Sequence, residues 1–414
     1  MLTAGFSSSC ITPPLPFPLA GFSRREGPSW KVSQQLWARS MVLNDGANRV
    51  GWVVCDLLEV GQPLVAAVRA AVEATGCLDA GNVMVGATHT HAGPDVYGEW
   101  GTGGRPEAVE AYREYLPHAI ATSLVGAVSD LEPATLAWGE VDVQGVGASR
   151  RAGGTAPLRL GALVATGKGG LRGMRVVYPC HGTVLGPDNL TVNGDIIGAV
   201  VQAMEHANGA AGRCSWAQGA AGDVSTRTTR RSRAPEELER LAMTVASGAA
   251  AAAAGSRPLP ADLQVRLRRA GTPLALKDDG GPGPQRGAPA VSERAPGDRS
   301  EAALLEEALA VRAARREDGR PREDWGEVCA LSLGDLALCF LPGEPFGSIE
   351  QDLIARTGLP GVRVVGYSNG APGYVFTPED EVEGGYEVMA SPLTGEAGTQ
   401  LVSTAAELLS HAGD

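Results

Sequence analysis

Apolar positions follow two different spacings along this chain, and the two spacings alternate from one end of the chain to the other. Short apolar runs bounded by turn residues predict strands at 38–43, 50–56, 83–85, 135–138, 159–165, 174–179, 328–332, 336–341 and 362–367. Apolar residues at helical spacing predict helices at 63–75, 106–131, 196–206, 235–254, 300–317, 345–357 and 398–411. This succession predicts an α/β fold, with layers of mixed β-sheet covered by helices.

One segment departs from this pattern. Residues 271–300 are dominated by Pro, Gly and charged side chains, as in the run that begins at Gly280. Such composition is typical of a flexible surface insertion. The chain shows no repeat of fixed period, so we expect residues 1–414 to form a single large domain that carries this insertion.

The composition limits the partners of the protein. The 414 residues are 43% hydrophobic and 20% charged, which is typical of a globular protein. A net charge of −12 argues against nucleic acid or an anionic membrane surface as the main partner. The longest apolar tract, 249–254, is far shorter than the ~20 residues of a membrane-spanning helix, so no stable membrane insertion is expected.

The cell compartment is inferred from the cysteines and the N-terminus. The seven cysteines are scattered without CxxC pairs, which favours reduced thiols over a disulfide framework. The first residues lack the basic start and long apolar segment of a signal peptide. A cytoplasmic location is therefore predicted, and Cys180, beside an apolar run, is interpreted as a buried structural thiol.

The most informative segment is 86–95, which holds two of the six histidines. It follows the apolar run 83–85, and residues i and i+2 of a strand point to the same face. His89 and His91 are therefore expected to project together where the strand ends. Two imidazoles at one spot indicate a metal or acid–base site, although an ordinary polar turn also explains them.

Other predicted strands also end in polar side chains, namely His181, Asp223 with Ser225, Glu344, and Tyr374 with Tyr386 twelve residues later. Each has a structural explanation when it is taken singly. An acidic residue such as Glu344 is favourable at a helix N-terminus, and a tyrosine such as Tyr374 is common in a core with its hydroxyl hydrogen-bonded. An aspartate such as Asp223 is common in a turn. Together they favour a ligand site, because such sites gather at strand ends in α/β folds. Asp195 either caps the helix that follows it or orients a histidine.

The order of these motifs resembles the neutral, non-lysosomal ceramidases. The motifs are His-Thr-His-x-Gly-Pro at 89–94, Cys-His-Gly-Thr at 180–183, Gly-Asp-Val-Ser at 222–225, Pro-Gly-Glu at 342–344 and Asn-x-x-x-Gly-Tyr at 369–374. The resemblance extends over residues 53–387. It implies a ceramidase-like catalytic domain without the C-terminal β-domain and signal peptide of the extracellular members.

The resemblance also implies a site. One Zn²⁺ would be held by His89, His181, Glu344 and Tyr374. The catalytic residues would be His91, Tyr386, Ser225 and Arg150, with His91 facing the substrate carbonyl and Tyr386 helping to hold the oxyanion. Ser225 and Arg150 match positions that contact the amide or its polar head, and the adjacent Arg151 is an alternative to Arg150.

The implied reaction is hydrolysis of an N-acyl amide by zinc-bound hydroxide. Nitrogen and oxygen ligands suit Zn²⁺, which lowers the pKa of its water to ~7. His91 and Tyr386 can stabilise the oxyanion, and His91 can also protonate the leaving amine.

The sequence departs from the family around the substrate mouth, at Asp95, at Thr226–Arg227 and after Tyr386. The expected substrate is therefore a small-molecule N-acyl amide that need not be ceramide. Two alternatives remain open: an esterase, lactonase or amide-forming acyl transferase on the same zinc site, and a non-catalytic zinc- or ligand-binding protein. The oligomeric state stays unknown.

Overall fold

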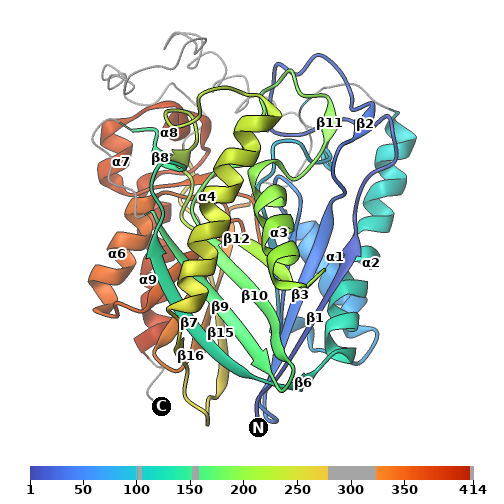
Figure 1. Cartoon of the computed structure of the whole chain (residues 1–414). Helices are drawn as coiled ribbons and strands as arrows, with labels where there is room; N and C mark the ends of the chain where they lie inside the picture. The colour runs from blue at the N-terminus through green and yellow to red at the C-terminus, as the bar shows by residue number, and fades with distance from the viewer. Residues whose placement is uncertain (99, 101–104, 152–157, 278–322, 411–414) are drawn as a thin grey trace.

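Three β-sheets form the centre of the computed structural model, which describes residues 1–98, 100, 105–151, 158–277 and 323–410 (Figure 1). The first sheet has the order β5-β4-β3-β1-β6. Its strands are β1 (Thr3–Cys10), β3 (Trp37–Asn44), β4 (Arg49–Cys55), β5 (Val83–Ala87) and β6 (Glu132–Pro133).

The second sheet has the order β12-β10-β9-β7-β14 and the third β15-β16-β17-β19. The second consists of β7 (Thr135–Asp142), β9 (Arg159–Gly167), β10 (Gly170–Tyr178), β12 (Cys214–Gln218) and β14 (Arg257–Pro258). The third consists of β15 (Val265–Pro273), β16 (Trp325–Leu333), β17 (Leu336–Phe340) and β19 (Val362–Val365).

Both faces are buried at the central strands of these sheets, and the period of two along each strand divides the side chains between two cores. In β4, Trp52 and Val54 point into a core shared by all three sheets, whereas Val53 and Cys55 face the helices outside. In β16, Leu331 likewise points into the shared core. Burial on both faces explains why the strands appear in the sequence as nearly continuous apolar runs.

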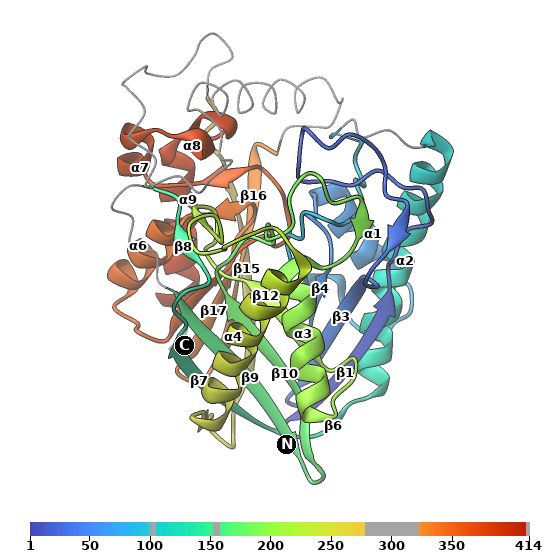
Figure 2. The same cartoon turned by 45° about the horizontal axis from the view of Figure 1, so that its top comes forward.

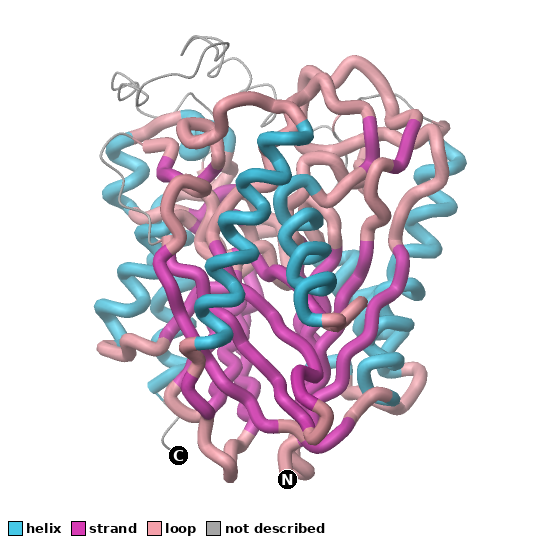
Figure 3. Tube along the Cα trace, in the orientation of Figure 1, coloured by secondary structure: helices cyan, strands magenta, loops and turns pink. Residues whose placement is uncertain are grey.

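A pair of helices covers the outer face of each sheet (Figure 2). The pairs are α1 (Gln62–Glu73) with α2 (Pro106–Ser129), α3 (Asp195–Asn208) with α4 (Pro235–Ala254), and α6 (Gly347–Thr357) with α9 (Gly395–Ser410). Figure 3 shows the strands inside and the helices outside. None of the described helices is long and apolar enough to cross a membrane.

The short elements lie in the connecting loops. They are η1 (Ala80–Asn82), α7 (Pro378–Glu383), α8 (Tyr386–Ala390) and three two-stranded pairs: β2 (Lys31–Val32) with β11 (Thr191–Val192), β8 (Ala148–Ser149) with β13 (Val224–Ser225), and β18 (Glu344–Pro345) with β20 (Tyr374–Val375).

The predicted fold class is confirmed, and the predicted elements that fall on described residues are present, most of them with shifted ends. The predicted insertion begins too early, because β15 pairs with β16 as far as Pro273 and Leu274 N donates to Asp324 O. Residues 278–300 and the predicted helix 300–317 lie outside the described residues. The helix predicted from Pro345 begins at Gly347, because Glu344 and Pro345 form β18.

Each large sheet contains one parallel pair of strands, and these pairs position the site. They are β4 with β5, β10 with β12, and β17 with β19. The carboxyl ends of parallel neighbours lie at the same edge of a sheet, which is where ligand sites form in α/β folds. The segments that follow β5, β10, β12, β17 and β19 carry the polar residues described next.

Candidate metal centre

His89 and His91 lie side by side in the loop after β5. Their Nε2 atoms are 3.1 Å apart, so the prediction that they project together is confirmed. The reason is different from the one predicted, because β5 ends at Ala87 and His89 has a φ of 61°. A left-handed turn, not the alternation of a strand, aims the two imidazoles at one spot. A positive φ in a non-glycine residue is costly and typical of functional sites.

A backbone carbonyl fixes the tautomer of each of three histidines. Nδ1 of His89 lies 2.8 Å from Leu58 O, and Nδ1 of His91 lies 2.8 Å from Gly21 O. Nδ1 of His181 lies 2.9 Å from Ala221 O. A carbonyl oxygen only accepts, so each Nδ1 carries the proton and each Nε2 of the neutral ring presents a lone pair.

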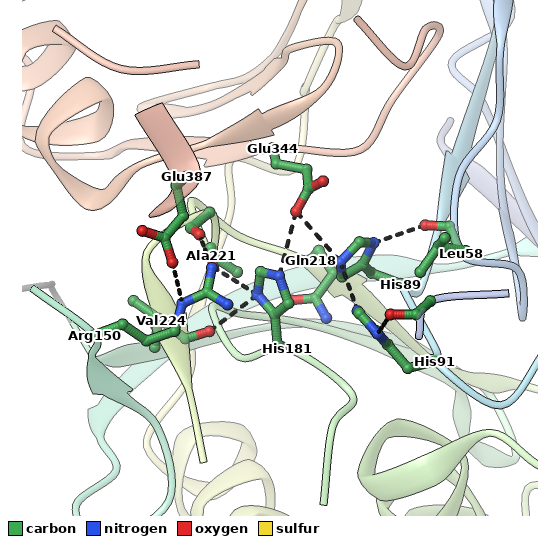
Figure 4. Close-up of polar contacts among 12 residues, drawn as sticks. Leu58, His89, His91, Arg150, His181, Gln218, Ala221, Val224, Glu344 and Glu387 are labelled. Carbon is green, nitrogen blue, oxygen red and sulfur yellow. Dashed lines mark hydrogen bonds and ion pairs between the residues drawn. The ribbon is translucent and has the colours of Figure 1, made fainter. Parts of the chain in front are cut away.

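Glu344 brings a carboxylate oxygen to two of these lone pairs (Figure 4). Its Oε2 lies 3.3 Å from His89 Nε2 and 3.2 Å from His181 Nε2. Burial lowers the pKa of His89 to about 3, against the opposing effect of Glu344, and burial also lowers the pKa of His181 far below its usual range. With both rings neutral, acceptor atoms face one another there.

These donor atoms fit a bound metal ion. Glu344 Oε2 and His181 Nε2 are buried without a hydrogen-bond partner, which is costly unless a cation satisfies them. Ligands ~2.0–2.1 Å from a tetrahedral Zn²⁺ are separated from each other by roughly 3.3 Å, close to the separations between these atoms. The ligand atoms of His89, His91 and His181 all lie within 4.8 Å of one another, so His91 also belongs to the cluster.

Tyr374 is brought to Glu344 by the short parallel pair of β18 and β20. Glu344 is opposite Tyr374 in this pair, and Glu344 N donates to Gly373 O at 2.9 Å. Facing residues of neighbouring strands project to the same side of a sheet. Burial, with Glu344 adding to it, raises the pKa of Tyr374 well above its usual value. The hydroxyl is therefore neutral unless a cation lowers its pKa.

The two adjacent arginines have different surroundings. Arg150 Nε lies 3.0 Å from Glu387 Oε1, and its guanidinium lies 5.9 Å from the centre of the Tyr374 ring. Burial acts to lower the pKa of Arg150, but Glu387 and the tyrosines outweigh it and the pKa is raised. Arg151 is instead paired with Glu383 at 2.7 Å, in α7. Of the two, Arg150 lies against the proposed metal ligand Tyr374.

Tyr386 and Ser225 lie at the edge of the cluster. Tyr386 begins α8, and its ring centre is 6.4 Å from that of Tyr374. Ser225 is buried in β13, where it is opposite Ala148, and its Oγ accepts a hydrogen bond from Arg227 N at 3.2 Å.

The two aspartates act on backbone and not on a histidine ring. Asp223 accepts hydrogen bonds from Gly347 N, at the start of α6, and from Ser149 Oγ. Asp195 accepts from Val184 N and from Ile196 N. Of the two roles considered for Asp195, support of the backbone at the start of α3 is the one in the structure. Cys180 is buried and burial raises the pKa of its thiol, as expected for a structural cysteine.

Two residues of the site were missed in the sequence. Gln218 is buried at the end of β12, and its Nε2 donates to Thr88 O at 2.8 Å and to Cys180 O at 2.7 Å. It therefore links the two loops that carry the histidines. Tyr367 packs on His89, with 4.4 Å between ring centres. Each lies a few residues before one of the motifs, at 222–225 and 369–374, and only tertiary contacts give it a role.

Comparison with known proteins relates this chain to others through its fold. No family model matches the chain, and a search of curated proteins found no significant match. Among solved structures, neutral ceramidase from Pseudomonas aeruginosa superposes with a TM-score of 0.76 at 20% identity, covering 99% of this chain and 75% of that one. A ceramidase complexed with C2 gives a TM-score of 0.77 at 20% identity, with the same coverage of both chains. The predicted resemblance to ceramidases is thus confirmed for the fold.

Proposed function

We propose that this protein is a zinc-dependent hydrolase that cleaves an N-acyl amide. The observation that carries the proposal is the convergence of Glu344 Oε2 on the Nε2 atoms of His89 and His181, because three buried acceptors in contact require a cation. The ceramidase fold supports amide hydrolysis as the reaction, since ceramide contains an amide bond. The sequence departs from the ceramidase motifs around Asp95 and after Tyr386. We therefore assign neither the acyl chain nor the head group of the substrate.

The proposed zinc ligands are His89, His181, Glu344 and Tyr374. Zinc bound there supplies a Lewis acid and a water with a pKa near ~7. We assign His91 to the substrate and not to the metal, because Glu344 Oε2 lies against His89 and His181, whereas the short contact of His91 is with His89 Nε2.

His91 is suited to act first as a base and then as an acid. Its Nδ1 proton is engaged by Gly21 O, so Nε2 accepts the proton of the attacking water. The protonated ring then passes this proton to the leaving nitrogen, and the C–N bond breaks. In its neutral state this tautomer offers no N–H at Nε2, so His91 stabilises the oxyanion only after it has taken the proton.

The remaining polar groups are proposed to position the substrate. Tyr386, beside Tyr374, donates to the carbonyl oxygen as negative charge develops on it. Arg150 and Ser225 contact the amide or the polar head, with Arg150 held in place by Glu387.

The test is a screen of short- and long-chain N-acyl amides and their matched esters, with and without a chelator. We expect amide cleavage that a chelator abolishes and Zn²⁺ restores. Cleavage of esters alone would indicate an esterase, and no turnover with a bound metal would indicate a binding protein. His206→Ala, on the exposed side of α3, is the control and should retain full activity.

We also propose a cytoplasmic location and a small-molecule partner. All seven cysteines are free in the structure, in agreement with a reducing compartment. Fractionation of native cells with an antibody against the protein tests the location, and recovery outside the cytoplasm would contradict it.

A further inference from the structure

Tyr367 occupies a strained position between the loop that carries the histidines and the loop that carries Glu344. It has a φ of 56°, and only 2% of its surface is exposed. Its backbone N donates to Gly343 O at 2.8 Å, and its carbonyl accepts from Ala87 N at 2.9 Å. A tyrosine with positive φ is strained and persists only where its surroundings impose it. The fold thus fixes this side chain at the site.

The hydroxyl of Tyr367 is buried and has no hydrogen-bond partner. The side chain lines a small recess together with His89, Glu344 and Glu59. A tyrosine hydroxyl is a neutral O–H at physiological pH, and a buried O–H without an acceptor is rare.

The unpartnered atoms around this recess are complementary. Glu344 Oε2 and His181 Nε2 are acceptors and are suited to a cation. The Tyr367 hydroxyl is a donor, so it is suited to an oxygen atom that enters with a ligand. His91 in its neutral tautomer offers no such donor at Nε2.

We propose that Tyr367 is a further catalytic residue, whose hydroxyl donates a hydrogen bond to the carbonyl oxygen of the substrate. This role rests on the proposed amide hydrolysis. When the water oxygen bonds to the carbonyl carbon, the π electrons of the C=O bond move to its oxygen, and the Tyr367 O–H stabilises that charge without giving up its proton. The water proton goes to His91 and then to the leaving nitrogen.

The alternative is that Tyr367 serves only to pack its ring against His89. Tyr367→Phe separates the two roles, because it keeps the ring and removes the hydroxyl. Tyr112→Phe is the matched control, since Tyr112 is also buried and its hydroxyl donates to Ile11 O, remote from the metal cluster.

Three quantities are measured on wild type and both variants: bound zinc, the steady-state constants for an N-acyl amide, and the affinity for the phosphonamidate analogue of that amide by calorimetry. For Tyr367→Phe we expect unchanged zinc, a KM close to that of wild type, and a kcat lower by about 10²–10³-fold. The affinity for the tetrahedral, charged phosphonamidate should fall by about the same factor. Tyr112→Phe should match wild type in all three.

A Tyr367→Phe variant with wild-type kcat and phosphonamidate affinity would show that the ring alone matters. Loss of zinc from this variant would also overturn the proposal, because the hydroxyl would then support the metal and not the substrate. If wild type itself neither cleaves amides nor binds the phosphonamidate, the proposed function fails first and this role fails with it.

Discussion

The histidines of the site show how single backbone contacts decide the chemistry of a side chain. His89, His91 and His181 each engage a carbonyl oxygen through Nδ1, so all three present Nε2 as an acceptor. An imidazole held in this way can bind a metal ion or accept a proton, and its neighbours decide which of the two it does. The proposed roles of His89 and His181 as ligands and of His91 as base rest on the position of Glu344 relative to each ring.

His89→Ala and His91→Ala are expected to have different consequences. Removal of His89 deprives the metal of a ligand, so the variant should lose zinc and all activity. Removal of His91 leaves His89, His181 and Glu344 in place, so it should retain about one zinc per chain with turnover lowered by about 10²–10⁴-fold, as for a lost general base. Metal analysis by mass spectrometry and a rate assay on the same samples check this.

His118→Ala is the control for a histidine removed from the surface, since His118 is exposed on α2. Zinc retained in His89→Ala would contradict the ligand assignment. Zinc lost from His91→Ala would place His91 among the ligands, as its distance to His89 Nε2 also permits.

The stability of the metal-free protein is expected to fall in mild acid. Burial lowers the pKa of His89 from 6.5 to about 3, so the folded state holds this ring neutral while the unfolded chain binds a proton below pH 6.5. Stability is therefore fully present above pH 6.5 and is lost progressively as the pH falls toward 3, by up to about 1.4 kcal/mol per pH unit for this residue.

Urea unfolding of the chelated protein at several pH values measures this slope. His89→Asn should show a shallower slope than wild type, by about one proton, because the other titrating groups are unchanged. Equal slopes for the two proteins would show that His89 is already protonated in the folded metal-free state.

Which site residues the sequence reveals depends on where their function comes from. His89, His181 and Glu344 follow apolar runs, and polar residues at strand ends are visible from pattern alone. Tyr367 and Gln218 look like ordinary residues of a loop and a strand, because their roles come from contacts with segments more than a hundred residues away. Only the folded chain brings these segments together.

At the scale of elements, the buried side-chain amide of Gln218 holds the loop after β5 and the loop after β10 in position relative to each other. Gln218 extends from the end of β12 and donates to the loop after β5 and to the loop after β10, while its Oε1 accepts from Cys180 N at 3.2 Å. The proposed metal ligands His89 and His181, in these two loops, are thus positioned by a residue that is not itself proposed as a ligand. Such supporting contacts fix the orientation of the ligands.

Gln218→Leu is expected to weaken zinc binding by about 10–100-fold and to lower the free energy of unfolding by about 2–3 kcal/mol. Leucine keeps most of the volume but leaves Thr88 O, Cys180 O and Cys180 N without their partner. Competition with a zinc-binding dye and urea unfolding measure the two effects. Gln202→Leu, at an exposed position of α3, is the control, and equal zinc affinity in Gln218→Leu would refute the role.

Elements with strong patterns are predicted well, and elements with weak patterns are missed. The helix predicted at 235–254 is observed as α4 with the same ends, because Pro235, two acidic residues and a long Ala-rich body all favour helix. β1 and β15 have no such signal. β1 contains three serines, and β15 contains three arginines and is exposed or half-buried at most positions. Pairing with β3 and β16 makes them strands.

The whole molecule is three sheets packed around a shared core, and the guanidinium of Arg175 lies where two of them meet. Arg175 of β10 is almost fully buried, and its guanidinium lies 4.1 Å from the centre of the Trp52 ring. It donates to Trp52 O and Arg39 O of the first sheet, each at 2.9 Å, and to Ser215 Oγ of the second at 2.7 Å. Burial lowers the pKa of this guanidinium to about 9, so it stays charged at neutral pH.

Arg175→Met is expected to lower the free energy of unfolding by about 2–4 kcal/mol. The variant loses three charge-assisted hydrogen bonds of about 1.5–3 kcal/mol each, while relief of the buried charge returns part of that cost. The metal cluster lies in the loops beyond the strand ends, so the folded variant should bind zinc as wild type does.

Urea unfolding and zinc titration measure the two quantities, with Arg213→Met, at a half-exposed arginine near Asp130, as the control. An Arg175→Met variant as stable as wild type would show that shape alone joins the two sheets, because methionine fills the space without the hydrogen bonds.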